Sequence, residues 1–260
     1  MSGKSFLAVC LTPTLQRTLL FPTVRRGEVN RSREYRIDAS GKGVNVARVL
    51  SQLGNSVVHL THLGGRHRGH FLEMAAEDGL EVRWVDSNSE IRTCYTVIDR
   101  SDHSTTELVE EAAPVASGTE ESLRRSYLEL LPEMHTVVIS GSKSSGYSSE
   151  IMPWMTGEAK RAGARVIADF RGDDLRRAMK HAPDVIKPNF TEFASTFLET
   201  EGSSSPFGPD RAKELSEHIT PEELERAAWK RMEELAGDGI AVILTRGSQP
   251  TMFALPDGSV

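Results

Sequence analysis

A short stretch around residue 42 combines a lysine, two glycines and the start of an apolar helical pattern. Gly41, Lys42 and Gly43 come first, and apolar residues then follow at helical spacing: Val44, Val46, Ala47, Val49 and Leu50. The pattern predicts a helix from residue 43. The first turn of a helix attracts anions, and glycine lets a ligand approach the backbone. The stretch therefore suits a phosphate group or a dense set of hydroxyls, and a glycine-rich turn with a solvated lysine fits it equally well.

The composition is that of a folded protein with an excess of acidic residues. The net charge of −6 argues against nucleic-acid binding, which needs a concentrated basic face. No apolar run reaches the roughly 18 residues that span a bilayer, and the N-terminal MSGKSFLAVCL has neither a long apolar core nor a cleavage site. We expect a cytoplasmic protein that binds neither nucleic acid nor membrane. Cys10 and Cys94 lack metal-ligand spacing, which favours buried free thiols.

Apolar runs typical of buried strands alternate with amphipathic helical patterns. The runs are continuous, as in strands covered on both faces, and occupy residues 6–12, 57–63, 136–141, 165–170, 184–187 and 240–245. Helical patterns occupy residues 43–53, 68–78, 119–131, 148–162, 173–180 and 221–236. The alternation predicts an α/β fold with a doubly wound, mostly parallel sheet, in a single domain over residues 1–260.

Three stretches depart from this alternation. Residues 18–37 and 91–110 are typical of hairpins with polar faces, so we expect a small β-lid outside the main sheet, with segments about 13–37 and 91–110. Residues 199–220 are rich in Ser, Gly and Pro and predict a mobile insertion. Thr220 then suits the N-cap of a new helix.

Polar clusters follow five of the predicted strands, at the sheet edge where such folds bind ligands. They are TPTLQ at 12–16, GG at 64–65, SGSKSSG at 140–146, KPNFTE at 187–192 and TRGS at 245–248. Each cluster alone also fits an ordinary loop. Together with SGKGVNVA at 40–47 and IRT at 91–93, and in this order, they resemble the PfkB carbohydrate kinases of the ribokinase-like fold. The resemblance spans nearly the whole chain and is to the branch of 1-phosphofructokinase and tagatose-6-phosphate kinase.

The resemblance implies an ATP-dependent kinase with a sugar-phosphate substrate under the β-lid. By their motif positions, Lys42 and Arg92 would grip the substrate phosphate, and Asn45 would contact sugar hydroxyls. A compact ammonium and a bidentate guanidinium both suit phosphate. Solvated surface charges remain the alternative for both side chains. The other positions expected at the substrate are Gln16, Gly41 and Ser140, the last in a loop of residues 140–142 between the two ligands.

The same resemblance implies binding of ATP and Mg²⁺ by the later motifs. Asn189 and Glu192 match an N-x-x-E motif associated with magnesium, and they would hold the ion through its water shell. Further nucleotide-binding positions would be Lys187, Thr245, Arg246 and Gly247. The spacing of Asn189 and Glu192 equally predicts a helix cap.

Two departures from the family pattern bear on activity. Thr12 and Gln16 stand where the family has Asn and Asp, so binding of a ketohexose phosphate should weaken by on the order of 1.5–3 kcal/mol. The sequence also ends before a G-A-G-D motif, so the family's catalytic aspartate would lie beyond Val260. Three explanations stay open: an incomplete copy of a longer protein, a naturally short paralogue without turnover, or a relocated base at Asp169 or Asp173.

The sequence thus predicts a kinase that transfers the γ-phosphate of ATP to a hydroxyl of a phosphorylated ketohexose and is inactive as printed. The alternative is a non-catalytic regulatory paralogue that binds sugar phosphate or nucleotide. The resemblance implies a homodimer through the β-lid, and an exposed lid edge favours one physically.

Overall fold

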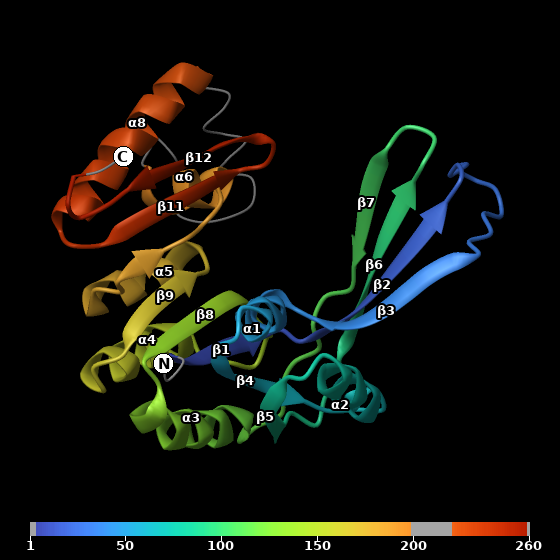
Figure 1. Cartoon of the computed structure of the whole chain (residues 1–260), viewed down its shortest axis with the longest axis horizontal. Helices are drawn as coiled ribbons and strands as arrows, with labels where there is room; N and C mark the ends of the chain where they lie inside the picture. The colour runs from blue at the N-terminus through green and yellow to red at the C-terminus, as the bar shows by residue number, and fades with distance from the viewer. Residues whose placement is uncertain (1–3, 199–219, 259–260) are drawn as a thin grey trace. The chain divides into compact units, whose positions relative to one another are not determined.

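The computed structural model describes residues 4–198 and 220–258, and contacts within the chain divide it into two units. The first unit comprises residues 1–130 and 141–147, and the second comprises residues 131–140 and 148–260. Figure 1 labels the elements of both units. The predicted insertion at 199–220 lies outside the described residues except for Thr220.

The first unit contains parallel strands with helices packed on them. β1 (Ser5–Leu11), β4 (Ser56–Leu63) and β5 (Glu81–Asp86) follow the order β1-β4-β5, and residues 141–143 at the end of β8 (Thr136–Lys143) neighbour β1. The helices are α1 (Lys42–Gln52), α2 (Arg68–Glu77) and α3 (Thr119–Leu130). The apolar runs predicted β1 and β4 but not β5. Only Val85 of β5 is buried, because this strand lies at the edge of the sheet and three of its six residues are charged.

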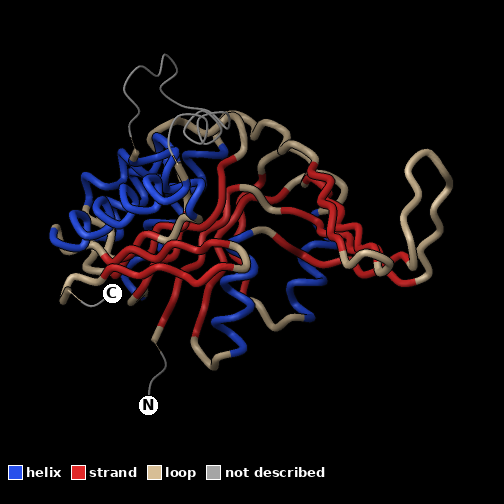
Figure 2. Tube along the Cα trace, turned by 90° about the horizontal axis from the view of Figure 1, so that it is seen from above, coloured by secondary structure: helices blue, strands red, loops and turns tan. Residues whose placement is uncertain are grey.

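Both predicted hairpins form and join in a second sheet of four strands, with the order β3-β2-β6-β7 (Figures 1 and 2). β2 (Thr14–Phe21) pairs antiparallel with β3 (Glu34–Ser40), and β6 (Arg92–Asp99) pairs antiparallel with β7 (Ser104–Val109). A parallel ladder between β2 and β6 connects the hairpins. We call this sheet the second sheet. It contains the segments predicted as a lid.

The second unit has a sheet with the strand order β12-β11-β10-β9-β8. Its strands are residues 136–140 of β8, then β9 (Arg165–Asp169), β10 (Val185–Ile186), β11 (Ala241–Arg246) and β12 (Gln249–Ala254). All pair in parallel except β11 and β12, which form an antiparallel hairpin. The helices are α4 (Ile151–Arg161), α5 (Gly172–Ala178), α6 (Phe190–Phe197) and α8 (Pro221–Gly237), with short 3₁₀ turns η1 (Leu131–Glu133) and η2 (Met179–His181). The predicted α/β fold with a mostly parallel sheet is therefore confirmed.

Local sequence signals account for the ends of several elements. α8 begins at the predicted cap, where the Thr220 hydroxyl accepts from the backbone N–H of Glu223. The loop predicted for residues 140–142 is wrong, because these residues continue β8 to Lys143. Gly141 has φ +98°, a conformation that glycine adopts without strain. No helix within the described ranges is long and apolar enough to cross a membrane.

Candidate functional site

In the first unit, the N-terminus of α1 lies against the end of β1. Lys42 is the first residue of α1, and Gly41 is the N-cap with φ +120°. A Cβ atom on Gly41 would lie 2.9 Å from Cys10 Sγ and 3.2 Å from the carbonyl oxygen of Thr12. On Gly43 it would lie 2.6 Å from the carbonyl oxygen of Val9. Close packing therefore requires glycine at both positions, and the positive φ of Gly41 adds a conformational requirement there.

Cys10 lies buried beneath this helix start. Burial raises the pKa of its thiol, whereas hydrogen bonds from the backbones of Thr12 and Gly43 and the charge of Arg92 act in the opposite direction. The thiol is one of two free cysteines, both buried, as the sequence predicted. Cys10 thus packs the end of β1 against α1 and lies within electrostatic reach of Arg92.

The two cations predicted to hold a phosphate both lie around residues 10–14. A Cβ atom on Gly141 would lie 3.4 Å from Cβ of Lys42 and 3.8 Å from Oγ1 of Thr12. Arg92, the first residue of β6, donates from Nε to Oγ1 of Thr14 at 2.9 Å. Lys42 is exposed and the Arg92 residue is half-buried. The first unit therefore carries Lys42 and Arg92 on segments that both adjoin residues 12–14.

Neutral side chains occupy the positions where the sequence analysis noted departures. Gln16 donates from Nε2 to Oγ1 of Thr96 at 2.8 Å, so its Oε1 is oriented away from that contact. Thr12 donates to the carbonyl oxygen of Ser142 at 3.2 Å. Both side chains thus have partners within the first unit, and neither adds a charge near Lys42 and Arg92.

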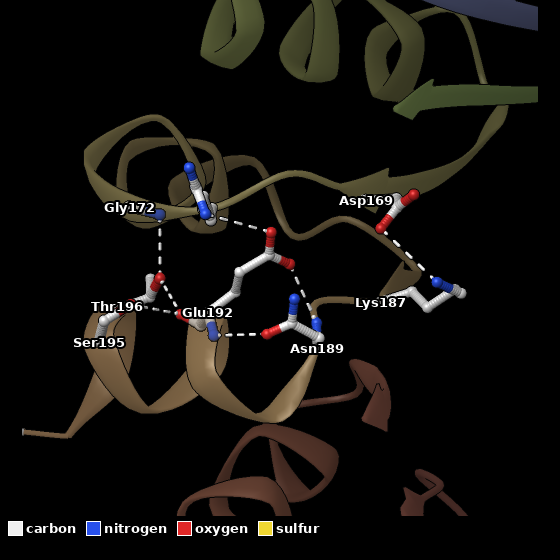
Figure 3. Close-up of polar contacts among 8 residues, drawn as sticks. Asp169, Gly172, Lys187, Asn189, Glu192, Ser195 and Thr196 are labelled. Atoms are coloured by element: carbon white, nitrogen blue, oxygen red, sulfur yellow. Dashed lines mark hydrogen bonds and ion pairs between the residues drawn. The ribbon is translucent and has the colours of Figure 1, made fainter. Parts of the chain in front are cut away.

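In the second unit, Asn189 and Glu192 form the predicted helix cap (Figure 3). The backbone N–H of Glu192 donates to Asn189 Oδ1 at 2.8 Å, and the backbone N–H of Asn189 donates to Glu192 Oε2 at 3.1 Å. Arg171 donates from Nη1 to Glu192 Oε1 at 3.4 Å. These contacts confirm the predicted cap, and a capping carboxylate can also bind the waters of a magnesium ion.

The donor set at this cap fits a magnesium ion held through water. A carboxylate oxygen can accept more than one hydrogen bond, so the contacts of Glu192 to Asn189 and Arg171 are compatible with hydrogen bonds from the waters of an ion. Residues 4–198 and 220–258 contain no group of three His, Cys, Asp or Glu side chains that would enclose a metal directly. Magnesium keeps several of its waters when bound, so a single carboxylate suffices for this mode of binding.

Ser140, Asp169 and Lys187 form a polar chain at the ends of successive strands. Ser140 donates to Asp169 Oδ2 at 2.6 Å. Lys187 Nζ lies 3.7 Å from Asp169 Oδ1 (Figure 3). Ser140 is buried within β8. Its hydroxyl therefore faces a carboxylate of its own chain, and not an open loop as predicted.

A cavity of about 390 Å³ in the second unit brings together most of the later predicted residues. Its lining consists of Asn189, Phe190, Thr191, Thr245, Arg246, Gly247 and Gln249. The guanidinium of Arg246 lies 5.6 Å from the ring centroid of Phe190. Glu225 of α8 accepts from both terminal nitrogens of Arg246, at 3.1 and 2.9 Å. The sequence analysis missed Phe190 and Glu225, and no local signal indicates Glu225, because only the fold brings it to Arg246.

Comparison with known proteins decides the family. A model described as pfkB family carbohydrate kinase matches residues 11–260. The chain belongs to the pfkB family. A curated relative, the 1-phosphofructokinase of Rhodobacter capsulatus, is 29% identical over 188 residues, which cover 72% of this chain and 60% of that protein. The chain thus matches less than two thirds of that relative's length.

Solved structures named as phosphofructokinases share the fold. A possible 1-phosphofructokinase from Thermotoga maritima has a TM-score of 0.81 at 21% identity, covering 97% of this chain and 75% of its own. Phosphofructokinase-2 from Escherichia coli in complex with fructose-6-phosphate has a TM-score of 0.77 at 21% identity, covering 97% of this chain and 77% of its own. The predicted family and fold are therefore both confirmed.

Proposed function

We propose that this chain belongs to an ATP-dependent sugar-phosphate kinase that transfers the γ-phosphate to a hydroxyl of a phosphorylated ketohexose. The substrate would be of the type used by 1-phosphofructokinase or tagatose-6-phosphate kinase. The observation that carries the proposal, beside family membership, is the position of Lys42 and Arg92 around residues 10–14. An ammonium and a guanidinium together suit a phosphate ester.

The first unit would hold the sugar phosphate. Lys42 and Arg92 bind its phosphate, and the N–H groups of the first turn beyond Gly41 add partial positive charge. Asn45 and Gln16 offer amides to the sugar hydroxyls. Ser140 was also predicted to bind the substrate, but its hydroxyl hydrogen is donated to Asp169. We therefore propose that Ser140 fixes the end of β9 at Asp169.

The second unit would hold the nucleotide at the cavity beside Arg246. Lys187, Asn189, Thr245, Arg246 and Gly247 surround or adjoin this region and offer cationic and backbone donors to phosphate oxygens. Glu192 would anchor the waters of the magnesium ion, which when bound neutralises charge on the nucleotide phosphates. In this proposal Glu192 both caps α6 and holds the hydrated ion.

We assign the catalytic base to neither Asp169 nor Asp173. Asp169 accepts from Ser140 and lies near Lys187, so protein partners already stabilise its charge. Asp173 lies 2.6 Å from Arg177 on the exposed first turn of α5. An acceptor for the substrate proton must face the attacking hydroxyl, and these contacts direct both carboxylates to cations of their own unit.

An assay of the longest natural open reading frame tests the proposal. ADP release would be measured with fructose 1-phosphate, fructose 6-phosphate and tagatose 6-phosphate as acceptors, in the presence of ATP and Mg²⁺. We expect turnover with at least one, and a loss of about 10- to 100-fold in kcat/KM for Lys42→Met or Arg92→Met, because each removes a charge-assisted hydrogen bond. Lys4→Met, in an exposed residue at the start of the described chain, is the control.

A non-catalytic regulatory protein is the second candidate. The neutral Gln16, held by Thr96, favours it, because an amide gives a sugar hydroxyl a weaker acceptor than a carboxylate. Ligand binding without ADP release for all three sugar phosphates would support this candidate and overturn the kinase. We place either protein in the cytoplasm, in line with its small-molecule ligands.

We also propose a homodimer through the second sheet. The strand register puts Leu19, Tyr35, Tyr95, Val97 and Leu108 on one face of that sheet, opposite to the face with Gln16 and Thr96. Tyr35 and Leu108 are exposed, at 61% and 55%. The mass of the full chain in solution tests this: Leu108→Lys should give monomers, and Glu107→Lys on the opposite face should not. An unchanged mass for Leu108→Lys would refute the interface.

A further inference from the structure

The guanidinium of Arg48 joins three separate parts of the first unit. Its Nε and Nη2 donate to Asp78 Oδ2 at 2.9 and 2.7 Å, and Nη2 also donates to the carbonyl oxygen of Ala39 at 2.7 Å. Its Nη1 donates to Asn45 Oδ1 at 2.7 Å. Asp78 follows the last turn of α2, Ala39 lies in β3, and Asn45 lies in α1. Arg48 is thus fixed in position by groups on three elements.

This arrangement determines which way the Asn45 amide faces. Arginine donates hydrogen bonds and never accepts them, so the oxygen of Asn45 must be the atom that faces Arg48. The two Nδ2 hydrogens then point away from Arg48. Within residues 4–198 and 220–258, no hydrogen bond uses them, and Asn45 is an exposed residue.

The amide hydrogens lie on the helix surface that carries Lys42. Lys42 and Asn45 are three residues apart in α1, so their side chains are neighbours on one face. Arg48 itself is paired with Asp78 and its side chain is only 18% exposed, so it is poorly placed to bind a ligand anion directly. Its effect on a ligand would pass through Asn45.

We propose that Arg48 is a positioning residue that holds Asn45 as a hydrogen-bond donor toward the sugar phosphate. The inference rests on the proposed function of the Lys42 surface. It adds a rule of recognition: at this position the ligand must present an acceptor oxygen, whether of a hydroxyl or of a phosphate ester, because the Asn45 oxygen is already occupied. Asp78 contributes indirectly by fixing the guanidinium of Arg48.

A double-mutant cycle on the full chain tests the proposal, with fructose 1-phosphate as the calorimetric titrant. Arg48→Lys keeps a cation beside Asp78 but cannot reach Asp78, Ala39 and Asn45 together. We expect about five- to tenfold weaker binding for Arg48→Lys and for Asn45→Ala. The double variant should bind no more weakly than Asn45→Ala alone. Equal losses from Arg48→Lys in both backgrounds would overturn the proposal.

The control and a second readout separate positioning from folding. Arg68→Lys is the matched control, because Arg68 also pairs with an aspartate in the same unit, Asp86 at 3.1 Å, and not with Asn45. NMR relaxation of the Asn45 side-chain amide should show order in the wild type and mobility in Arg48→Lys. An equally ordered amide in both proteins would overturn the proposal.

The same experiments distinguish failure of the proposed function from failure of the positioning role of Arg48. If the wild type binds none of fructose 1-phosphate, fructose 6-phosphate and tagatose 6-phosphate, the substrate assignment is wrong, and the donor role toward a sugar phosphate is wrong with it. Loss of amide order in Arg48→Lys would still show that Arg48 orients Asn45.

Discussion

The buried hydroxyl of Ser140 donates a 2.6 Å hydrogen bond to the carboxylate of Asp169. Asp169→Ala removes the acceptor and leaves a buried donor unpaired, so we expect the free energy of unfolding to fall by about 1–3 kcal/mol. Asp173→Ala removes an exposed ion pair with Arg177 and should cost under about 1 kcal/mol. Urea unfolding of both variants measures the two losses of unfolding free energy. Equal losses would contradict the prediction that Asp169→Ala costs more.

Gln16→Asp should restore a charged acceptor for the sugar. The new carboxylate loses the donor to Thr96 but offers a charge-assisted hydrogen bond to a hydroxyl. We expect binding of a ketohexose phosphate to strengthen by on the order of 1.5–3 kcal/mol, less the cost of the lost Thr96 contact. Calorimetric titration with fructose 6-phosphate measures the change. Thr96→Val is the control, since it removes the same internal contact without adding charge, and tighter binding in Thr96→Val would refute the explanation.

Two arginines of the second unit allow a matched test of the cavity. Arg246 pairs with Glu225 and lies 5.6 Å from the Phe190 ring, whereas Arg231 pairs with Glu234 and lies 5.8 Å from the Phe197 ring. Only Arg246 of these two lines the cavity. We expect Arg246→Ala to weaken ATP binding about tenfold or more and Arg231→Ala to leave it unchanged. Similar effects from both would exclude the cavity as the nucleotide site.

Two buried histidines make the first unit sensitive to acid. Burial lowers the pKa of both His59 and His62 to about 4 from 6.5. His59 bonds through Nδ1 to the carbonyl oxygen of Ala8 at 3.0 Å, and His62 bonds through Nδ1 to the hydroxyl of Tyr147 at 2.9 Å. Because the unfolded chain binds protons more readily in this range, stability should be full above pH 6.5 and decline as the pH falls toward 4.

The size of this decline can be measured. Each histidine contributes at most about 1.4 kcal/mol per pH unit within the window from 6.5 to 4. Urea unfolding between pH 5 and 7 gives the slope of the free energy of unfolding against pH. His59→Leu should reduce this slope by up to about 1.4 kcal/mol per pH unit, which corresponds to one proton. Val49→Ala, at an exposed position on α1, should not. A slope unaffected by His59→Leu would show that His59 does not titrate as burial predicts.

Interactions within a few residues could be predicted from the sequence. The caps of Asn189 with Glu192 and of Thr220 with Glu223 have both partners within one helical turn, so the residue types alone indicated them. The helix at Lys42 followed from its apolar spacing and began one residue before the predicted start. The ordered motifs also predicted the family that the comparison confirmed.

Interactions between distant residues could not be predicted in this way. The loop expected around Ser140 is a strand, because the pairing of β8 with β9 extends through Ser140 and Asp169. The contacts of Gln16 with Thr96, and of Arg246 with Glu225, depend on strand register and helix packing. The sequence by itself determined most of the elements, their order and the residue types of the candidate site, since these depend on local propensity. Only the tertiary structure decided which polar atom faces which, because a side chain's partner is set by the packing of segments far apart in the chain.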